Sequence, residues 1–126
     1  MLGSGENMPV KKRILVVDDD DSMLNLYQRV FTDSGYDIDF ADTISAALGL
    51  LGKSDYDLMV TDYMFPDGLG TDLIRDFEEK YGGKKCMLVS GSTTAPDPGK
   101  YPSLVAFYGK PFPIKMFLEA VARALA

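Results

Sequence analysis

The sequence predicts an α/β fold in which helices cover both faces of a five-stranded parallel sheet. Short apolar runs, typical of strands buried on both faces, alternate along the chain with segments whose apolar residues recur at helical spacing. The links between them are short, which favours strand–helix–strand units with right-handed crossovers between parallel strands. With 126 residues, 46% of them hydrophobic and 25% charged, the chain is long enough for one packed domain.

The first strand and helix are predicted from an apolar run and from the residues that flank it. Residues 13–17 (RILVV) contain a run that suits a buried strand. In the helix that follows, Asp21 or Ser22 is expected to cap the amino end, and Gly35 is expected to end it. Residues 36–41 then alternate as a half-buried strand does.

The middle of the chain repeats this order. Thr43 is expected to cap a second helix that Gly52 closes. Residues 58–61 (LMVT) predict the third strand, which ends just before Asp62. A loop containing Pro and Gly is expected over residues 65–70 (FPDGLG), before the third helix.

The last third departs from the pattern once. Glycines 82–83 are expected to end the third helix, and residues 86–89 and 104–108 predict the fourth and fifth strands. Between them, residues 91–103 carry three prolines, so we expect a loop with at most one helical turn in place of a fourth helix. Pro113 is placed to open the last helix.

Together these elements match a small doubly wound domain with the flavodoxin-like strand order 2-1-3-4-5, in which the fourth helix is short or replaced by a proline-rich loop. We assign residues 11–126 to this domain. Residues 1–10 are polar and lack periodicity, so we expect a disordered lead-in or a cloning remnant.

The composition excludes several kinds of chemistry. The chain has no histidine and one cysteine, which excludes histidine bases, imidazole metal sites and an internal disulfide, and fits a reducing, cytoplasmic setting. A net charge of −6 argues against direct binding to nucleic acid or an anionic membrane, and no apolar run approaches a membrane span. Residues 80–126 hold seven bases and two acids, so the last third could meet an acidic partner, or its charge could be a solvated surface only.

Polar residues gather where the predicted strands end. Residues 18–21 (DDDD), Asp62, Ser90 and Lys110 each follow or end a strand, and parallel strands end at one edge of the sheet. Clustered carboxylates raise one another's pKa values unless a cation joins them, and an oxygen-only set favours Mg²⁺. Carboxylate, cation, ammonium and hydroxyl together suit phosphoryl transfer.

Four motifs stand in order at four strand ends: RILVVDDDDS, LMVTDYMFPDG, MLVSGS and FYGKPF. They closely resemble the receiver domain of two-component response regulators over residues 11–126. The resemblance implies a signalling switch that takes a phosphoryl group from a histidine kinase, a histidine phosphotransfer protein or a small donor such as acetyl phosphate. It also implies that the chain catalyses only its own phosphorylation and dephosphorylation, and is not an enzyme in the usual sense.

The resemblance assigns the acceptor and the metal ligands. It implies that Asp62 is the phosphorylation site and that Asp18, Asp19 and Asp62 hold Mg²⁺, Asp18 mainly through water. Met64 would add its backbone carbonyl. Its apolar side chain stands where a polar one often places the hydrolytic water, so we expect slow self-dephosphorylation.

The resemblance also assigns the catalytic and switch residues. It implies that Ser90 and Lys110 assist the transfer at Asp62, that Ser90 later turns toward the phosphoryl group, and that Phe107 then moves inward. The bond from Lys110 to Pro111 is usually cis in this family. We expect a monomer or a weak phosphorylation-dependent dimer that acts on a downstream protein or on a fused output domain, without direct contact to nucleic acid or membrane.

Other interpretations remain. Asp20 and Asp21 are better explained as helix-capping carboxylates than as metal ligands. A degenerate receiver that only binds other proteins is the main alternative. A haloacid-dehalogenase-type phosphatase is disfavoured because residues 18–21 lack its full signature and the chain is short, and a flavin protein is disfavoured by the acidic loop after the first strand.

Overall fold

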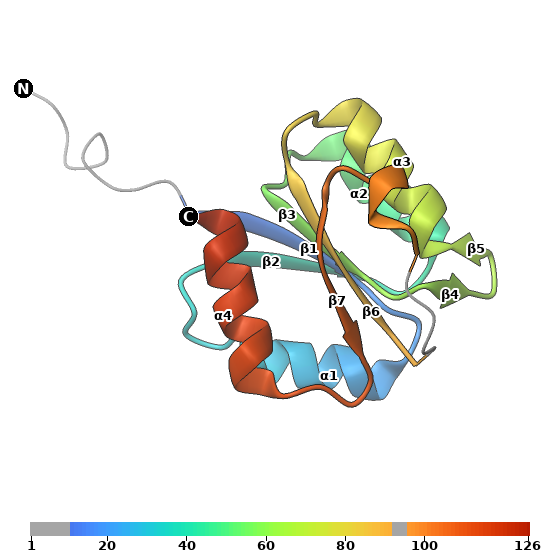
Figure 1. The fold of residues 1–126 in the computed structure, drawn as a ribbon. Helices are drawn as coiled ribbons and strands as arrows, with labels where there is room; N and C mark the ends of the chain where they lie inside the picture. Colours follow the sequence, from blue (N-terminus) through green and yellow to red (C-terminus); the bar gives the residue numbers. More distant parts are fainter. Residues whose placement is uncertain (1–10, 92–95) are drawn as a thin grey trace, which may run out of the picture.

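The structure is a computed structural model that describes residues 11–91 and 96–126, so the predicted lead-in over residues 1–10 lies outside the described residues. Strands and helices alternate as predicted (Figure 1). The elements are β1 (Arg13–Val17), α1 (Asp21–Val30), β2 (Asp37–Ala41), α2 (Ile44–Lys53), β3 (Leu58–Thr61), β4 (Met64–Phe65), β5 (Gly68–Leu69), α3 (Gly70–Lys80), β6 (Lys85–Ser90), the 3₁₀ turn η2 (Pro98–Lys100), β7 (Leu104–Gly109) and α4 (Ile114–Leu125).

The main sheet has five parallel strands in the order β2-β1-β3-β6-β7. Since β6 and β7 are the fourth and fifth strands of this sheet along the chain, the order is the flavodoxin-like 2-1-3-4-5 that the sequence predicts. The strand ladder is regular except for a bulge where β7 pairs with β6, between Cys86 and Met87. In the part of the chain that the structure describes, no helix is long and apolar enough to cross a membrane.

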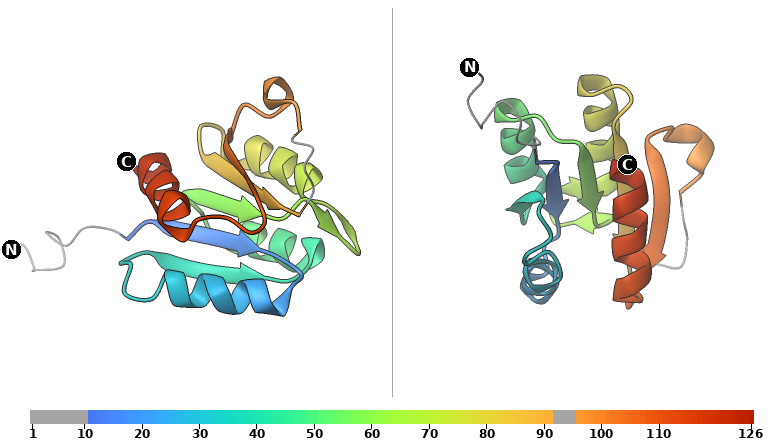
Figure 2. Two further views of the ribbon diagram at one scale, coloured as in Figure 1. Left: turned by 60° about the horizontal axis from the view of Figure 1, so that its bottom comes forward. Right: turned by 90° about the vertical axis from the view of Figure 1, so that its left-hand side faces the viewer.

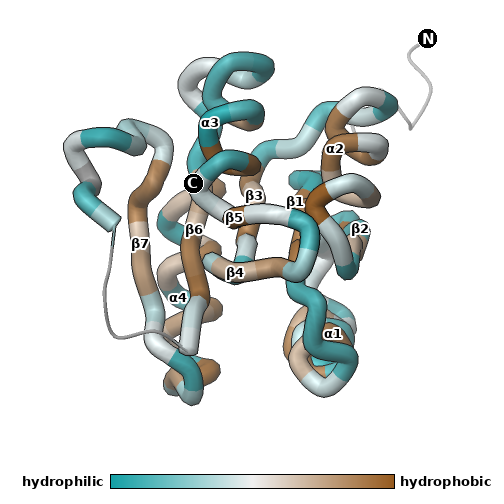
Figure 3. Tube along the Cα trace, turned by 90° about the vertical axis from the view of Figure 1, so that its right-hand side faces the viewer, coloured by the Kyte–Doolittle hydropathy of each residue, from teal (hydrophilic) through white to brown (hydrophobic). Residues whose placement is uncertain are grey.

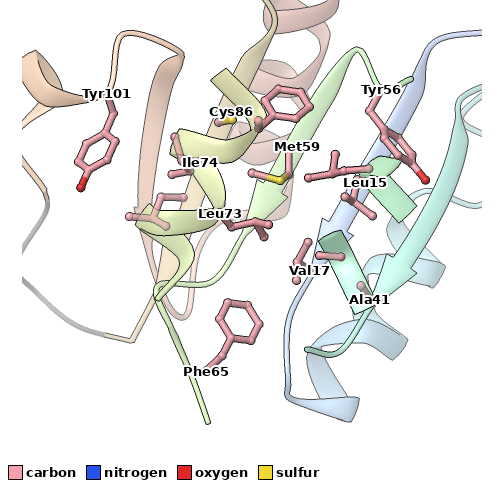
Figure 4. Packing of buried hydrophobic residues seen from close by; sticks show 14 residues of the cluster. Leu15, Val17, Ala41, Tyr56, Met59, Phe65, Leu73, Ile74, Cys86 and Tyr101 are labelled. Carbon is pink, nitrogen blue, oxygen red and sulfur yellow. The ribbon is translucent and has the colours of Figure 1, made fainter. Parts of the chain in front are cut away.

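Helices cover both faces of this sheet (Figure 2). Alternate residues of the central strands point to opposite faces, and each set joins a separate apolar core. The core under α2 and α3 includes Leu15, Met59 and Leu88, and part of it is drawn in Figure 4. The core under α1 and α4 includes Val16 and Val60. Burial on both faces explains why β1 after Arg13 and β3 before Thr61 are continuously apolar.

Two predicted boundaries of α1 are wrong. The N-cap is Asp20 and not Asp21 or Ser22, because the Asp20 carboxylate accepts a hydrogen bond of 2.8 Å from the Ser22 amide. The helix ends at Val30 and not at Gly35, which adopts a positive φ of 84° in the turn that follows. The Asp20 cap agrees with the interpretation of this carboxylate as a helix cap.

The second and third helices also end at other residues than predicted. Thr43 caps α2 as expected, but the helix continues through Gly52 to Lys53 because nothing there requires a positive φ. Helix α3 ends at Lys80, before the two glycines, of which Gly83 has a φ of 91°. At the last helix, Pro113 is the N-cap and lies just outside the first turn.

The link from β6 to β7 contains no α-helix among its described residues, 91 and 96–103, which agrees with the proline-rich loop that we predict. Its regular part is the 3₁₀ turn η2. The turn leads to Tyr101, which is 9% exposed and joins the core beside α3, where the guanidinium of Arg75 lies 5.3 Å from the centre of its ring. Ser103 donates to Glu78 of α3 through its amide (2.9 Å) and its hydroxyl (2.5 Å).

The link from β3 to α3 is more regular than predicted. In place of a loop over residues 65–70, the chain forms a two-stranded antiparallel hairpin, β4–β5, with Met64 opposite Leu69 and Phe65 opposite Gly68. Figure 3 shows this hairpin between the ends of α2 and α3. The side chain of Phe65 is buried in the core under these helices, which explains why the link is ordered in spite of its Pro and Gly content.

Candidate functional site: an acidic pocket at the carboxyl edge of the sheet

The strand ladder brings the predicted site residues to one edge of the sheet. The backbone amide of Asp18 donates to Ala41 of β2, and the amide of Asp62 donates to Val17 of β1, both at 3.0 Å. The amide of Lys110 donates to the carbonyl of Ser90 at 2.8 Å. These backbone hydrogen bonds hold Asp18, Asp62 and Lys110 at the points where their strands end. The positions of the three side chains therefore follow from the register of the sheet.

Lys110 joins the two carboxylates of this edge. Its ammonium lies 2.8 Å from Oδ2 of Asp18 and 2.9 Å from Oδ2 of Asp62. The three side chains are 19%, 1% and 14% exposed, respectively, so the contacts are shielded from most of the solvent. Partial burial makes each contact stronger than an ion pair on the surface, and removal of Lys110 would leave two neighbouring carboxylates without their counter-ion.

The pKa values reflect this arrangement. Burial raises the pKa of the Asp18 carboxyl, and hydrogen bonds from the Lys110 ammonium and the Asp20 amide offset part of the rise. For Lys110, burial alone would lower the pKa, but the hydrogen bonds to Asp18 and Asp62 outweigh it and the pKa is raised overall. The ammonium therefore stays charged at neutral pH.

Three carboxylates of this site could hold a metal ion. One oxygen from each of Asp18, Asp19 and Asp62 lies within 4.8 Å of the others. Asp18 is buried, Asp62 is half-buried and Asp19 is exposed, so the cluster opens to solvent on one side. An oxygen-only set with an open side fits Mg²⁺, which keeps several of its waters and takes few protein ligands. Met64 follows Asp62 by two residues in the sequence, begins β4 and is 64% exposed.

The predicted switch residues lie on the two strands next to this cluster. Ser90 is the last residue of β6 and is 3% exposed. Phe107 of β7 is half-buried, pairs with Leu88 and packs against the core under α2 and α3. The bond from Lys110 to Pro111 is cis, as the resemblance implies. The structure thus brings Asp18, Asp19, Asp62 and Lys110 together and ends β6 with Ser90 at the same edge, while Phe107 lies two residues before the end of β7.

Two residues with notable contacts in the connection after Asp62 were not singled out from the sequence. A Cβ on Gly70 would lie 1.9 Å from the carbonyl oxygen of Asp62, so only glycine allows α3 to begin this close to the acceptor. Asp67, at the turn of the β4–β5 hairpin, accepts hydrogen bonds from the first two amides of α2. The Asp-Gly pair of the FPDG segment is a signal for a tight turn, but both contacts join segments that are distant in the sequence, which no local pattern reports.

A model of the response regulator receiver domain family matches residues 14–122. The chain belongs to this family. Among characterised relatives, the chain is 31% identical over 113 residues to the probable transcriptional regulatory protein SilR of Salmonella typhimurium, with 88% of this chain and 48% of SilR covered. The chain thus spans half or less of the length of the first curated relatives that it matches.

Solved receiver domains share the fold as well. The receiver domain of HemR from Leptospira biflexa is 32% identical, has a TM-score of 0.80 and covers 92% of this chain and 95% of its own. The response regulator TrrA of Thermotoga maritima, solved in complex with Mg²⁺-BeF, is 26% identical, has a TM-score of 0.81 and covers 90% of this chain and 99% of its own. Both likenesses therefore extend over at least 90% of this chain.

Proposed function

We propose that this receiver domain accepts a phosphoryl group on Asp62 in a reaction that depends on Mg²⁺. The observation that carries the proposal is the position of the Lys110 ammonium, which contacts the carboxylates of both Asp18 and Asp62 at the open carboxylate cluster. The intact set of acceptor, counter-ion and metal ligands argues against a degenerate receiver that only binds other proteins. The complex of the related TrrA with Mg²⁺-BeF supports the choice of metal.

In this reaction a carboxylate oxygen of Asp62 attacks the phosphorus atom of the donor. A P–O bond forms on Asp62 while the bond from phosphorus to the donor nitrogen or oxygen breaks, and the leaving group keeps the electron pair. Asp18 (mainly through water), Asp19, Asp62 and the Met64 carbonyl would hold Mg²⁺, which would supply neutralisation of charge on the phosphoryl oxygens. Lys110 neutralises charge on the same group, since its ammonium already contacts the acceptor at 2.9 Å.

The phosphoryl group then changes the neighbouring strands. It adds charge and acceptor oxygens beside Ser90 and Lys110, which favours a turn of the Ser90 hydroxyl toward it. The ring of Phe107, half-buried two residues before the end of β7, moves into the space beside Ser90. This change is a population shift between two packings of the same fold.

The partners follow from the same proposal. The chain has no histidine, so the phosphoryl group comes from a histidine kinase, a histidine phosphotransfer protein or a small acyl phosphate in the cytoplasm. The output is a contact with a downstream protein or with a fused output domain, as the transcriptional regulators among its relatives suggest. We propose a monomer that dimerises weakly, if at all, on phosphorylation.

Intact-mass measurement after incubation with acetyl phosphate tests this function. The wild type should gain one phosphoryl group with Mg²⁺ present and none with EDTA, and Asp62→Asn should gain none under either condition. An adduct that persists in Asp62→Asn would place the modification elsewhere. No adduct on the wild type, combined with no Mg²⁺ binding, would favour the degenerate receiver.

A further inference from the structure

The β4–β5 hairpin, which follows Asp62 directly, contacts α2 through one side chain at its turn. The carboxylate of Asp67 accepts from the amides of Ile44 and Ser45, with 3.1 Å between donor and acceptor in each case. The two contacts use different carboxylate oxygens, so the group is held in one orientation. These hydrogen bonds lower the pKa of the Asp67 carboxyl, which therefore stays ionised near neutral pH.

Helix α2 has its own N-cap besides this carboxylate. The hydroxyl of Thr43 accepts from the Ala46 amide at 2.9 Å. One cap of this kind is the usual arrangement at the start of a helix. The hydrogen bonds of Asp67 are therefore additional, and they join the helix to a segment more than 20 residues away in the sequence.

The hairpin itself is too short to be stable alone. Each of its strands has two residues, and an isolated two-stranded hairpin is marginal in water even when it is longer. Its fixed conformation therefore depends on contacts with the rest of the molecule. One of these contacts is made by the buried ring of Phe65. Another is made by Gly68, which has a φ of 155° and lies next to Ile44 of α2: a Cβ added to Gly68 would lie 3.4 Å from Cγ1 of Ile44.

The other end of the hairpin contacts the acceptor. The Gly70 amide donates to the Tyr63 carbonyl at 2.6 Å, and the Gly70 backbone lies directly against the Asp62 carbonyl. The Tyr63 amide in turn donates to Oδ1 of Asp62 at 2.6 Å. A continuous series of contacts thus runs from the first turn of α2, through the hairpin, to the acceptor carboxylate.

We propose that Asp67 is a positioning residue for phosphoryl transfer, because its two hydrogen bonds to α2 hold the hairpin that carries the Met64 carbonyl and orients Asp62. This inference rests on the proposed function of the site. When the Asp67–α2 contact is absent, the turn of the hairpin loses two charge-assisted hydrogen bonds, and the strand that begins at Met64 is no longer held to α2 through this turn. Loss of a partner that orients metal ligands lowers metal affinity by about 10–100-fold in well-studied sites.

The test compares Asp67→Ala with Thr43→Ala. Both variants remove a cap from the same helix, but only Asp67→Ala removes the contact with the hairpin. We expect both to melt at a lower temperature than the wild type. Asp67→Ala should also raise the Mg²⁺ dissociation constant by about 10-fold and slow phosphorylation by acetyl phosphate, while Thr43→Ala should leave both within about twofold of the wild type.

Asp67→Asn completes the series and is the gentler variant should Asp67→Ala fold poorly. It keeps one neutral acceptor oxygen in place of two charged ones, so its Mg²⁺ affinity should lie between those of the wild type and Asp67→Ala. Equal Mg²⁺ affinities in the wild type, Asp67→Asn and Asp67→Ala would overturn the positioning role. So would equal losses of affinity in Asp67→Ala and Thr43→Ala.

The wild type separates the two proposals in the same experiment. If it binds Mg²⁺ and is phosphorylated on Asp62 while the Asp67 variants match it, the positioning role fails and the proposed function stands. If the wild type neither binds Mg²⁺ nor gains a phosphoryl group, the proposed function fails and the role of Asp67 fails with it.

Discussion

Two connections leave the carboxyl edge of the sheet beside the same site, and they are held in different ways. The connection after β3, residues 62–70, is held at two places: the Asp67 carboxylate accepts from two α2 amides, and the Gly70 backbone lies against the Asp62 carbonyl. The described part of the connection after β6 contacts α3 through the ring of Tyr101 on Arg75 and through the amide and hydroxyl of Ser103 on Glu78, with no backbone packed directly against the backbone of the site among these contacts.

The two connections differ in amino-acid composition and have different tasks: one carries the acceptor, and the other lies next to Ser90 and Phe107. Three prolines in residues 91–103 have no backbone N–H, and the described part of this connection contacts α3 through Tyr101 and Ser103. Side-chain contacts of this kind can be exchanged for others at small cost, whereas a backbone packed against a backbone cannot move without strain. We therefore expect the connection that carries the acceptor to be the rigid one and the connection next to Ser90 and Phe107 to change on phosphorylation.

Gly70→Ala should have the largest effect, because it breaks the rigid connection. The new Cβ would lie 1.9 Å from the Asp62 carbonyl oxygen, so the start of α3 or the end of β3 must shift. Forced shifts in packed regions cost about 1–3 kcal/mol, and we expect a loss near the upper end together with a strong loss of phosphorylation at Asp62. Urea denaturation and intact-mass measurement check the two effects.

Gly52→Ala is the matched control for this substitution. Gly52 lies within α2, and an added Cβ there meets nothing within 4 Å. Alanine has the higher helix propensity, so this variant should be more stable by about 0.5–1 kcal/mol and should be phosphorylated normally. Equal stability of Gly70→Ala and Gly52→Ala would show that the close approach of α3 to Asp62 is not a constraint.

Tyr101→Ala should have the next largest effect and tests the other connection. The ring is 9% exposed and contacts Arg75 at one side of the core, so its loss should cost about 2 kcal/mol, less than for an aromatic ring enclosed on all sides. Phosphorylation of Asp62 should stay within about twofold of the wild type, since Tyr101 touches no group of the acidic pocket. Tyr101→Phe keeps the ring and should behave like the wild type in both measurements.

Asp57 lies at the opposite end of the sheet from the acidic pocket, and its substitution serves as a control that should change stability without changing phosphorylation. Burial alone would raise the pKa of its carboxyl, but hydrogen bonds from the Arg13 amide and the Lys84 ammonium, each at 2.9 Å, lower it below 3.8 overall. Its contribution to stability is therefore complete above pH 3.8 and is lost as the pH falls through the lower folded-state value.

Asp57→Asn should remove this part of the acid dependence and cost about 0.5–1 kcal/mol at neutral pH, because solvent screens the exposed Lys84 ammonium. Thermal melts of both proteins between pH 3 and pH 7 measure the difference, and phosphorylation at neutral pH should be unchanged. A constant difference over the whole range would contradict the lowered pKa of Asp57.

Met64→Asn should have the smallest effect on stability. We expect it to change only the lifetime of the phosphoryl group on Asp62. The side chain is 64% exposed, so stability should change by less than about 0.5 kcal/mol. A polar side chain beside the phosphoryl group can place the hydrolytic water, and the phosphorylated form of the variant should decay several-fold faster. A longer lifetime in Met64→Asn, measured by the loss of the mass adduct after removal of the donor, would contradict this role.

The sequence predicts the strand order and the site residues because both depend on patterns that are local and repeated. Buried parallel strands leave apolar runs such as residues 13–17, and the register of a parallel sheet brings residues such as Asp18, Asp62 and Lys110 to one edge. The positions of these polar residues at successive strand ends were enough to predict that Asp18, Asp62 and Lys110 lie together, while their roles in phosphoryl transfer stay predictions.

The sequence does not predict the helix ends and the hairpin, because several neighbouring residues could serve equally well. Asp20, Asp21 and Ser22 are consecutive polar residues, and each could cap α1. In the structure the cap is Asp20, whose backbone amide donates to the Asp18 carboxylate at 2.9 Å. The roles of Asp67 and Gly70 depend on where α2 and Asp62 lie in space, and no periodicity in the chain contains that information.

Amide hydrogen exchange, with and without Mg²⁺ and beryllofluoride as a phosphoryl analogue, tests the division between the two connections most directly. We predict that the analogue changes exchange in residues 96–109, which include the contacts of Tyr101 and Ser103 and the strand of Phe107, and leaves the hairpin over residues 64–69 as protected as before. A change confined to the hairpin, with residues 96–109 unaffected, would contradict the account.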